Sequence, residues 1–550
     1  MISQIPLLSL LTFLPLAGMF VLAFVPKDKV LVLRGVTVAI TLLQLALAVV
    51  VWLNFDTSLA GVNNPKTFQF VERFSWVRIS GVGIFGNVAI DYFMGLDGLS
   101  VTMILLTTLI TAIASVASFS VNRNVKGYFL MFLLLDVGMI GTFCALDFFM
   151  FYVFWELMLL PMYFLIGIWG GARREYAALK FFIYTLLGSV VMLLVMIGLS
   201  YSTQVMLFSP DTHSVILNPL THKPEMYHTF SMLQMMNPAA MVKDSIFFGL
   251  GTDWRYIGFL GLFFAFAIKI PMFPFHTWLP DAHVEAPTAI SVILAGVLLK
   301  MGGYAILRLC FGIFPEIAFA LSWYIAMFGV INIIYGAFCA MAQSDFKRLI
   351  AYSSISHMGF VLLGIASLNS QGMMGAILQM FNHGMISAML FLLVGVLYDR
   401  TQLRGILEFG GLANQMPKYF ALIVIAMFAA LGLPGMSLFI SEAFVFIGAF
   451  QAWQMWAIIA ALGIVLTAAY YLWTLQRMFF GALPERWNAL TDVTPRELVT
   501  LIPLAGIIIA LGIYPGPLLD LTTCSVNQLV TFVHSHGVIP SVVHGAAIVK

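Results

Sequence analysis

Charged side chains are scarce in this sequence. Only 9% of its 550 residues are Asp, Glu, Lys or Arg, whereas 61% are hydrophobic. A soluble domain has about 25% charged residues, so this chain has too few charges to cover a water-facing surface, which excludes a soluble globular protein. Apolar runs of about 18 residues or more recur along the whole chain, and each is long enough to cross a bilayer. The sequence therefore predicts an all-α polytopic membrane protein.

Cysteine is also rare. Cys144, Cys310, Cys339 and Cys524 lie far apart and show no CxxC or other metal spacing, so we expect buried structural thiols and neither an iron–sulfur site nor a disulfide framework. The net charge of +2 argues against a nucleic-acid partner. The N-terminus, MISQIPLLSLL, lacks the basic region of a signal peptide, so the first apolar run is expected to remain as a span.

About fourteen segments have the length and composition of a membrane span. They lie near residues 6–25, 30–53, 98–119, 127–146, 148–169, 180–201, 256–274, 288–309, 319–341, 349–367, 372–398, 418–440, 452–475 and 499–516. The segment 54–96 contains the alternating stretch FQFVERFSWVRI, which predicts a small hairpin outside the bilayer. The segment 202–255 reads as a polar insertion, and its histidines, His213, His222 and His228, are expected to be solvated rather than metal-bound.

The lysines and arginines of the loops predict an orientation. Most of them fall on one side of the predicted spans, and basic loops face the cytoplasm. Both termini and both long loops are therefore expected on the opposite side of the membrane.

A faint internal repeat is present. YFLIG (163–167) followed by AALKFFIY (177–184) resembles FVLLG (360–364) followed by AILQMFNH (376–383). The odd number of predicted spans between the copies would invert one repeat relative to the other, which is a common transporter design.

Several ionisable residues lie inside the predicted spans. A charge at mid-membrane costs at least about 2.5–3.5 kcal/mol, so each is a candidate functional residue. The candidates are Glu156, Lys269, Lys300, His383 and Glu442, with Asp136, His357 and His276 as a second set, in which His276 lies just after the span 256–274. Single residues of this kind could be static hydrogen-bonded links between helices, and for Asp136 and His357 both readings stay open. A set spread over separate spans argues against static links alone and for a functional role.

The stretch FAIKIPMFPFHTWLP places Lys269 just before helix-breaking prolines. Burial favours the neutral amine and a nearby carboxylate opposes this, so Glu156 approaching or leaving would switch Lys269 between releasing and holding a proton. Pro271 and Pro274 remove backbone donors and open the helix, and residues 433–435 (LPG) break a second span in the same way. Because freed carbonyls need protein or water partners, we expect a hydrated path through both breaks.

Four longer stretches resemble a known family. They are FWELMLLPMYFLIGIWGG, KIPMFPFHTWLPDAHVEAPTAISVILAGVLLKMGGYAILR, DFKRLIAYSSISHMGF and FNHGMISAMLFLLVGVLYDR. They resemble the antiporter-like membrane subunits of respiratory complex I, NADH:quinone oxidoreductase, over about 120–480. The resemblance implies about fourteen transmembrane helices with two inverted five-helix repeats and broken helices. It also implies a chain without a cofactor of its own that moves protons, while flavin, iron–sulfur clusters and quinone belong to partner subunits.

The resemblance also implies roles for individual residues. Glu156 would be a carboxylate paired with Lys269, Lys300 the connecting lysine, His383 the relay histidine and Glu442 the terminal carboxylate. The implied partners are the other membrane subunits of complex I, especially the neighbouring antiporter-like subunits L and N, together with the lipid bilayer. The implied location is the bacterial inner membrane, with both termini periplasmic.

Four parts of the chain follow from these expectations. Residues 1–119 hold the N-terminal spans and the external hairpin, 120–310 the first repeat with its insertion at about 202–255, 311–480 the second repeat, and 481–550 the last span and a C-terminal tail.

Three alternatives belong to other protein classes. A subunit of a multi-subunit Na⁺/H⁺ antiporter or of a membrane-bound hydrogenase would share the fold and the Glu–Lys pair. A non-translocating scaffold is disfavoured by the cost of the buried charges. A quinone-binding redox subunit has no haem-type histidine pair or cysteine cluster to support it.

Overall fold

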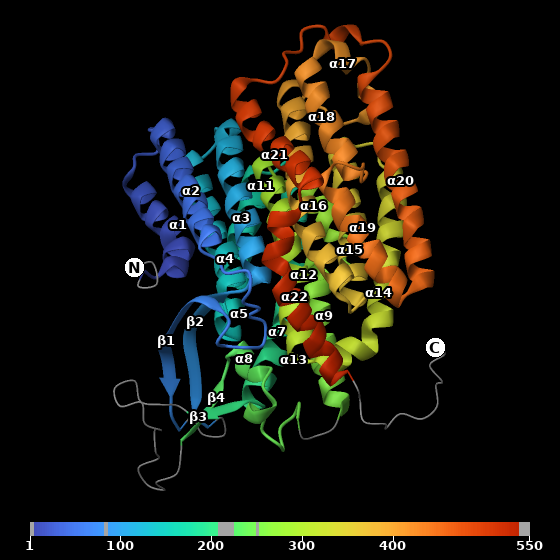
Figure 1. Cartoon of the computed structure of the whole chain (residues 1–550). Helices are drawn as coiled ribbons and strands as arrows, with labels where there is room; N and C mark the ends of the chain where they lie inside the picture. The colour runs from blue at the N-terminus through green and yellow to red at the C-terminus, as the bar shows by residue number, and fades with distance from the viewer. Residues whose placement is uncertain (1–4, 82–85, 207–224, 249–251, 538–550) are drawn as a thin grey trace.

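The computed structural model describes residues 5–81, 86–206, 225–248 and 252–537. It is a bundle of helices with a small sheet at one end and the short helix α17 (Leu412–Gln415) at the other (Figure 1). These two ends are called the sheet end and the α17 end below.

Twelve helices in the described residues are long and apolar enough to cross a membrane. Ten are single helices: α1 (Leu7–Phe24), α2 (Val30–Leu53), α3 (Gly98–Ala117), α4 (Val125–Cys144), α7 (Arg174–Tyr201), α14 (Pro315–Met341), α15 (Phe346–Ala366), α16 (Ser370–Thr401), α20 (Gln454–Phe479) and α21 (Pro495–Ile513). Two are composite: α5 (Phe148–Leu157) continues into α6 (Leu159–Trp169), and a run from α11 (Thr288–Ile293) extends to α13 (Phe311–Ile313).

Two further spans are broken in the middle. One consists of α9 (Thr252–Lys269) and α10 (Trp278–Glu285), and the other of α18 (Pro417–Ala430) and α19 (Ser437–Ala452). Both breaks fall where the prolines of the sequence predict them. With the twelve helices above, they account for the predicted number of spans.

The predicted hairpin is confirmed. Strands β1 (Gln69–Ile79) and β2 (Val88–Leu96) pair antiparallel. The insertion extends the same sheet, because β4 (Met226–Thr229) pairs with β2 and with β3 (Gln204–Met206), which gives the order β1-β2-β4-β3.

The insertion histidines are only partly placed. His228 lies on β4 beside the Gln204 amide, at 3.2 Å, whereas His213 and His222 lie outside the described residues. Within the described ranges, no group of three or more His, Cys, Asp or Glu side chains could hold a metal ion.

The two copies of the repeat run in opposite directions. Helix α7, which carries the first copy, leads into β3 at the sheet end, whereas α16, which carries the second, leads toward α17 at the other end (Figure 1). An inverted repeat requires this arrangement.

The region expected as a C-terminal tail is largely helical. Helix α22 (Gly516–His536) packs against α3 and α16 and ends at the sheet end. Helix α1 begins at the same end, where the Ser9 amide donates to Glu72 of β1 at 3.0 Å. Both ends of the described chain therefore lie at the sheet end.

Candidate functional site

Four ionisable side chains from four different helices meet in the core of the bundle. Lys300 Nζ lies 2.9 Å from His383 Nδ1, the rings of His383 and His357 are 5.4 Å apart, and His357 Nδ1 lies 3.6 Å from Glu442 Oε1. None of the four residues is more than 6% exposed. We call Lys300, His383, His357 and Glu442 the buried cluster. Lys300, His383 and Glu442 were predicted from the sequence as functional residues. His357, for which a static structural role was also left open, lies between His383 and Glu442.

Lys300 lies on an irregular helix. Its α-helical turn, α12 (Leu299–Ala305), is flanked by two π-helical turns, η5 (Leu294–Leu298) and η6 (Ile306–Cys310). The Lys300 ammonium also donates to the Ala295 carbonyl inside the first π turn. Single π turns are rare and occur often at functional sites. The distortion therefore coincides with the lysine that sequence analysis singled out.

Glu156 and Lys269 are neighbours without direct contact. Each lies within the electrostatic range of the other, but no ion pair of 4.0 Å or less joins them in this part of the described chain. The Lys269 ammonium lies instead over the Trp155 ring, 4.9 Å from its centroid. Lys269 is 2% exposed. The proposed switching of Lys269 by Glu156 stays a prediction.

Protein groups satisfy much of the backbone that the first break opens. The Phe273 amide donates to Asn332 Oδ1 at 2.7 Å, and Asn332 Nδ2 donates to the Pro271 carbonyl at 3.2 Å. The Trp278 indole donates to the Ile268 carbonyl at 2.9 Å. Water is therefore not needed as a partner for these groups, and the hydrated path inferred from the break stays a prediction.

The second break brings backbone directly against Glu442. Gly432 has φ +76°, and a Cβ at this position would lie 2.6 Å from Glu442 Oε2. A residue with a side chain disfavours this conformation and would collide with the carboxylate. The Asn382 amide holds the start of α19 by donating to the Ser437 carbonyl at 2.8 Å.

The two halves of the site are in close packing contact. A Cβ on Gly302, in the Lys300 helix, would lie 2.7 Å from the Ile270 amide nitrogen, directly after Lys269. Glycine allows this close approach. The helix that carries Lys300 therefore lies against the broken end of the helix that carries Lys269.

Asp136 and His276, the other two residues predicted from the sequence, lie apart from the buried cluster. Asp136 on α4 accepts a hydrogen bond from Thr111 of α3 at 3.2 Å, and no hydrogen bond or ion pair among the described residues joins it to Lys300 or Lys269. His276 lies in the first break, 2% exposed, with its ring 5.1 Å from that of Tyr335.

Sequence reasoning missed His283 and Lys347. His283 lies on α10 and is fully buried, and Lys347 at the start of α15 is 6% exposed. Both lie in polar stretches at the predicted ends of spans, WLPDAHVE and DFKRL. Such stretches are typical of solvated helix ends, and only the three-dimensional fold places the two side chains in the core.

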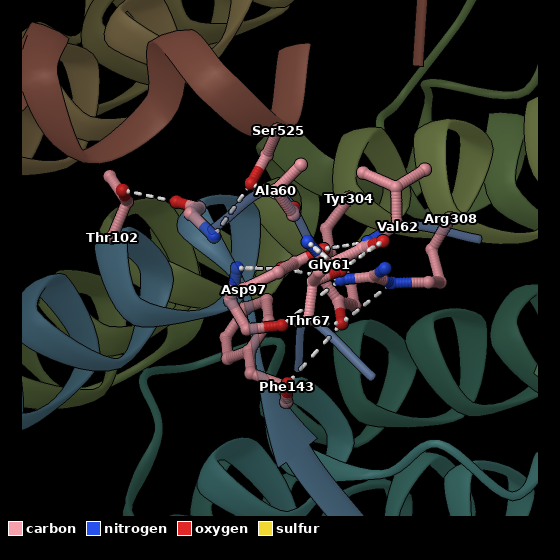
Figure 2. A network of polar contacts seen from close by, with 12 residues as sticks. Ala60, Gly61, Val62, Thr67, Asp97, Thr102, Phe143, Tyr304, Arg308 and Ser525 are labelled. Carbon is pink, nitrogen blue, oxygen red and sulfur yellow. Dashed lines mark hydrogen bonds and ion pairs between the residues drawn. The ribbon is translucent and has the colours of Figure 1, made fainter. Parts of the chain in front are cut away.

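A second buried network anchors the Lys300 helix at its sheet end (Figure 2). Arg308 Nη2 donates to Asp97 Oδ1 at 2.6 Å, and the two residues are 2% and 0% exposed. Asp97 also caps α3 by accepting from the Ser100 amide at 3.0 Å. The Tyr304 hydroxyl lies 3.3 Å from Arg308 Nε, and the Gly98 amide donates to Ser525 of α22 at 3.0 Å. The network ties η6, α3 and α22 together.

Known proteins share both this sequence and this fold. A family model described as NADH:quinone oxidoreductase/Mrp antiporter, transmembrane, matches residues 145–467. NADH-quinone oxidoreductase subunit M of Rhodobacter capsulatus is 40% identical over 541 residues, which cover 96% of this chain and 97% of that protein. Subunit M of Rickettsia conorii is 38% identical over 534 residues, 96% of this chain and 99% of that protein.

Solved structures give the same result. A chain of respiratory complex I from Thermus thermophilus superposes with a TM-score of 0.79 at 27% identity, covering 96% of this chain and 99% of that one. A chain of the Mrp complex from Dietzia superposes with a TM-score of 0.75 at 21% identity, covering 97% and 100%, and is alike in fold alone. The family match over residues 145–467 and the near-complete similarity to subunits M show that this chain belongs to the NADH:quinone oxidoreductase/Mrp antiporter family of membrane subunits.

Proposed function

We propose that this chain is the M-type, proton-translocating membrane subunit of a respiratory complex I, which couples quinone reduction elsewhere in the complex to proton transport. The observation that carries the proposal is the buried cluster, a connected series of proton-binding side chains. The full-length similarity to proteins named NADH-quinone oxidoreductase subunit M supports this assignment over the antiporter and hydrogenase alternatives.

The geometry of the buried cluster suits proton transfer. Lys300 and His383 are at hydrogen-bonding distance, so a proton can pass directly from the ammonium to a neutral imidazole. The rings of His383 and His357 lie 5.4 Å apart. A rotation of either ring or a bridging water would allow a proton to pass between them. His357 then lies 3.6 Å from Glu442, close to hydrogen-bonding distance. Each step moves one proton between groups that can both bind and release it.

We infer the partners and the location from the same assignment. The neighbours would be the antiporter-like subunits L and N within the lipid bilayer of a bacterial inner membrane. The α17 end would face the cytoplasm, and the sheet end with both termini would face the periplasm. The chain would hold no cofactor, and flavin, iron–sulfur clusters and quinone would reside in partner subunits.

Lys300→Met tests the proposal, because methionine keeps the length of the side chain but cannot carry a proton. We expect NADH:quinone turnover and proton pumping of the assembled complex in vesicles to fall together, by about tenfold or more. Lys66→Met, at an exposed loop position before β1, is the matched control and should behave as wild type. Normal pumping by an assembled Lys300→Met complex would overturn the proposal.

The sodium-transporting alternative needs a different measurement. A proton pump should work equally well when Na⁺ is replaced by K⁺ on both sides of the vesicle membrane. Loss of transport under this exchange would favour the antiporter reading.

A further inference from the structure

Asp136 is a buried carboxyl group without a cation partner. The residue lies on α4 and is 0% exposed. One carboxyl oxygen accepts the hydrogen bond from Thr111, and no group of the described residues lies within hydrogen-bonding distance of the other. No ion pair of 4.0 Å or less reaches Asp136 within the same ranges. Buried polar groups are usually hydrogen-bonded and costly to leave unpaired, so this carboxyl group needs an explanation.

The surrounding helices offer Asp136 no charge to balance its own. Helices α1 and α3 contain no ionisable side chain, and the only one on α2 is Arg34, which donates to the Val121 carbonyl at 2.9 Å. On α5, Glu156 acts on Lys269 and not on Asp136. The other ionisable side chains on α4 and on the elements that pack against it, none of which acts on Asp136, are Asp91, Tyr92, Lys126, Tyr128, Cys144, Tyr152 and Tyr163. Because a buried carboxylate without a compensating charge is very unfavourable, Asp136 is expected to be neutral and to carry a proton.

A missing hydrogen bond in α1 brings an amide side chain to the same place. Pro15 lies inside α1 and has no amide hydrogen, so the carbonyl of Leu11, four residues earlier, loses its helical partner. Gln44 of α2 donates to this carbonyl at 3.0 Å and is near enough to act on the Asp136 carboxyl group. The side-chain oxygen of Gln44 is buried and has no partner in the part of the chain that the structure describes. We call Asp136 and Gln44, with their two unpartnered oxygen atoms, the α4 site.

One face of α1 leads from the α4 site to the sheet end. Thr12, next to Leu11, is 0% exposed, and its hydroxyl has no hydrogen-bond partner within the described ranges. Ser9 lies three residues earlier on the same face of the helix and is half-buried. Its hydroxyl is hydrogen-bonded to the Tyr92 hydroxyl and to Glu72, a half-buried residue of β1. Polar groups therefore follow α1 from the sheet end to the α4 site.

We propose that Asp136 is a proton-binding residue, separate from the buried cluster, that exchanges its proton with the sheet end along the hydroxyl groups of α1. Thr12 and Ser9 each accept a proton as they release their own, and Glu72 passes the last one to solvent. Water molecules bridge the steps that the hydroxyl groups do not span directly. The inference goes beyond the proposed relay and does not depend on it, because its route uses no residue of the buried cluster.

The infrared C=O stretch of the Asp136 carboxyl group tests the inference. The spectrum of the wild-type complex minus that of Asp136→Asn should show a protonated carboxylic acid, because asparagine keeps the shape but lacks this group. In D₂O the band should shift as the site takes up deuterium, and Thr12→Val, which removes a hydroxyl from the route, should slow this shift by about tenfold. Thr37→Val is the matched control: Thr37 is also buried, but it lies on α2 beyond Gln44 toward the α17 end. This variant should exchange at the wild-type rate.

Each alternative gives a different spectrum. A difference spectrum without the carboxylic acid band would show that Asp136 is ionised, and a band that does not shift in D₂O would identify a sealed static link between α3 and α4. Equal exchange rates in Thr12→Val and wild type would exclude the route along α1. Each of these three results contradicts the inference.

A second variant keeps the test decisive if Asp136→Asn does not assemble on a native gel. Asp136→Glu keeps a carboxyl group and should move the wild-type band without abolishing it. A band that stays unchanged in Asp136→Glu would not come from Asp136, and the inference would be wrong. All of these experiments measure proton binding at Asp136 rather than pumping, so their failure leaves the Lys300→Met test of the proposed function unaffected.

Discussion

Lys269 illustrates how the surroundings of one side chain define its role. Its ammonium faces the Trp155 ring rather than a carboxylate, and a cation over an aromatic face is stabilised by about 0.5–2 kcal/mol. Glu156, the residue after this tryptophan, interacts with the lysine electrostatically. It does not form an ion pair of 4.0 Å or less with it. This geometry fits a lysine whose partner comes and goes better than it fits a permanent ion pair.

Lys269→Arg and Lys269→Met test that reading. Arginine keeps the charge but stays protonated in proteins, and methionine cannot titrate, so both should impair pumping and the coupled NADH:quinone turnover. A permanent structural pair predicts that arginine restores function, since it binds carboxylates at least as well as lysine does. Proton uptake and quinone reduction should be measured in both variants after assembly is confirmed on a native gel. Full activity of the arginine variant would leave Lys269 as a structural cation.

Glu442→Gln separates charge from shape at the other end of the buried cluster. Glutamine fits the space beside Gly432 and can still accept a bond from His357, so the complex should assemble. It cannot accept the proton that His357 delivers, so pumping should fall by about tenfold or more. Proton pumping and NADH oxidation in vesicles measure this directly. An intact Glu442→Gln complex that pumps at the wild-type rate would remove Glu442 from the relay.

At the scale of helices, the span with Lys300 combines a distorted centre with a fixed end. Two π turns flank the lysine, while the Arg308–Asp97 pair holds the sheet end of the same span to α3 (Figure 2). Single π turns interrupt a regular helix and are frequent at functional sites. The span is therefore irregular where it carries Lys300 and tied to α3 at its sheet end.

Asp97→Ala should release this anchor. It leaves the Arg308 guanidinium buried without its partner and removes the cap of α3, and breaking a buried pair costs about 3–5 kcal/mol. We expect a lower thermal unfolding temperature of the purified complex and less assembled complex on a native gel. The double variant Asp97→Ala/Arg308→Met should be more stable than Asp97→Ala alone, because no charge is then left unpaired. A double variant as unstable as the single one would show that the cap, not the ion pair, dominates.

The sequence predicted the helices better than it predicted the site that they build. Apolar length predicts the spans and the prolines predict both breaks, because these effects are local along the chain. The alternating stretch likewise predicts β1 and β2. The contacts of His283 and the link through His357 depend on which faces of distant helices meet, and no local pattern encodes that. Helix α22 was expected only as a tail because its mixed polar composition does not resemble a span.

At the scale of the whole molecule, the positions of the basic residues and the positions of the chain ends indicate the same orientation in the membrane. Basic residues gather at the α17 end: Lys347 lies at the start of α15, Arg404 between α16 and α17, and Lys418 at the start of α18. The sheet end carries both ends of the described chain and the whole four-stranded sheet. Since basic loops are retained in the cytoplasm, these two features predict one orientation of the molecule.

Reporter fusions test this orientation. A reporter placed after Lys550 should be active in a format that works only in the periplasm and inactive in a format that works only in the cytoplasm. The matched control is a fusion after Gln415, at the end of α17, which should give the opposite pattern because it lies at the other end of the bundle. If both fusions reported the same side, the chain would cross the membrane an even number of times between Gln415 and Lys550, whereas opposite ends of the bundle require an odd number. If both patterns were reversed, the α17 end would face the periplasm, and the orientation predicted from the basic residues would be wrong.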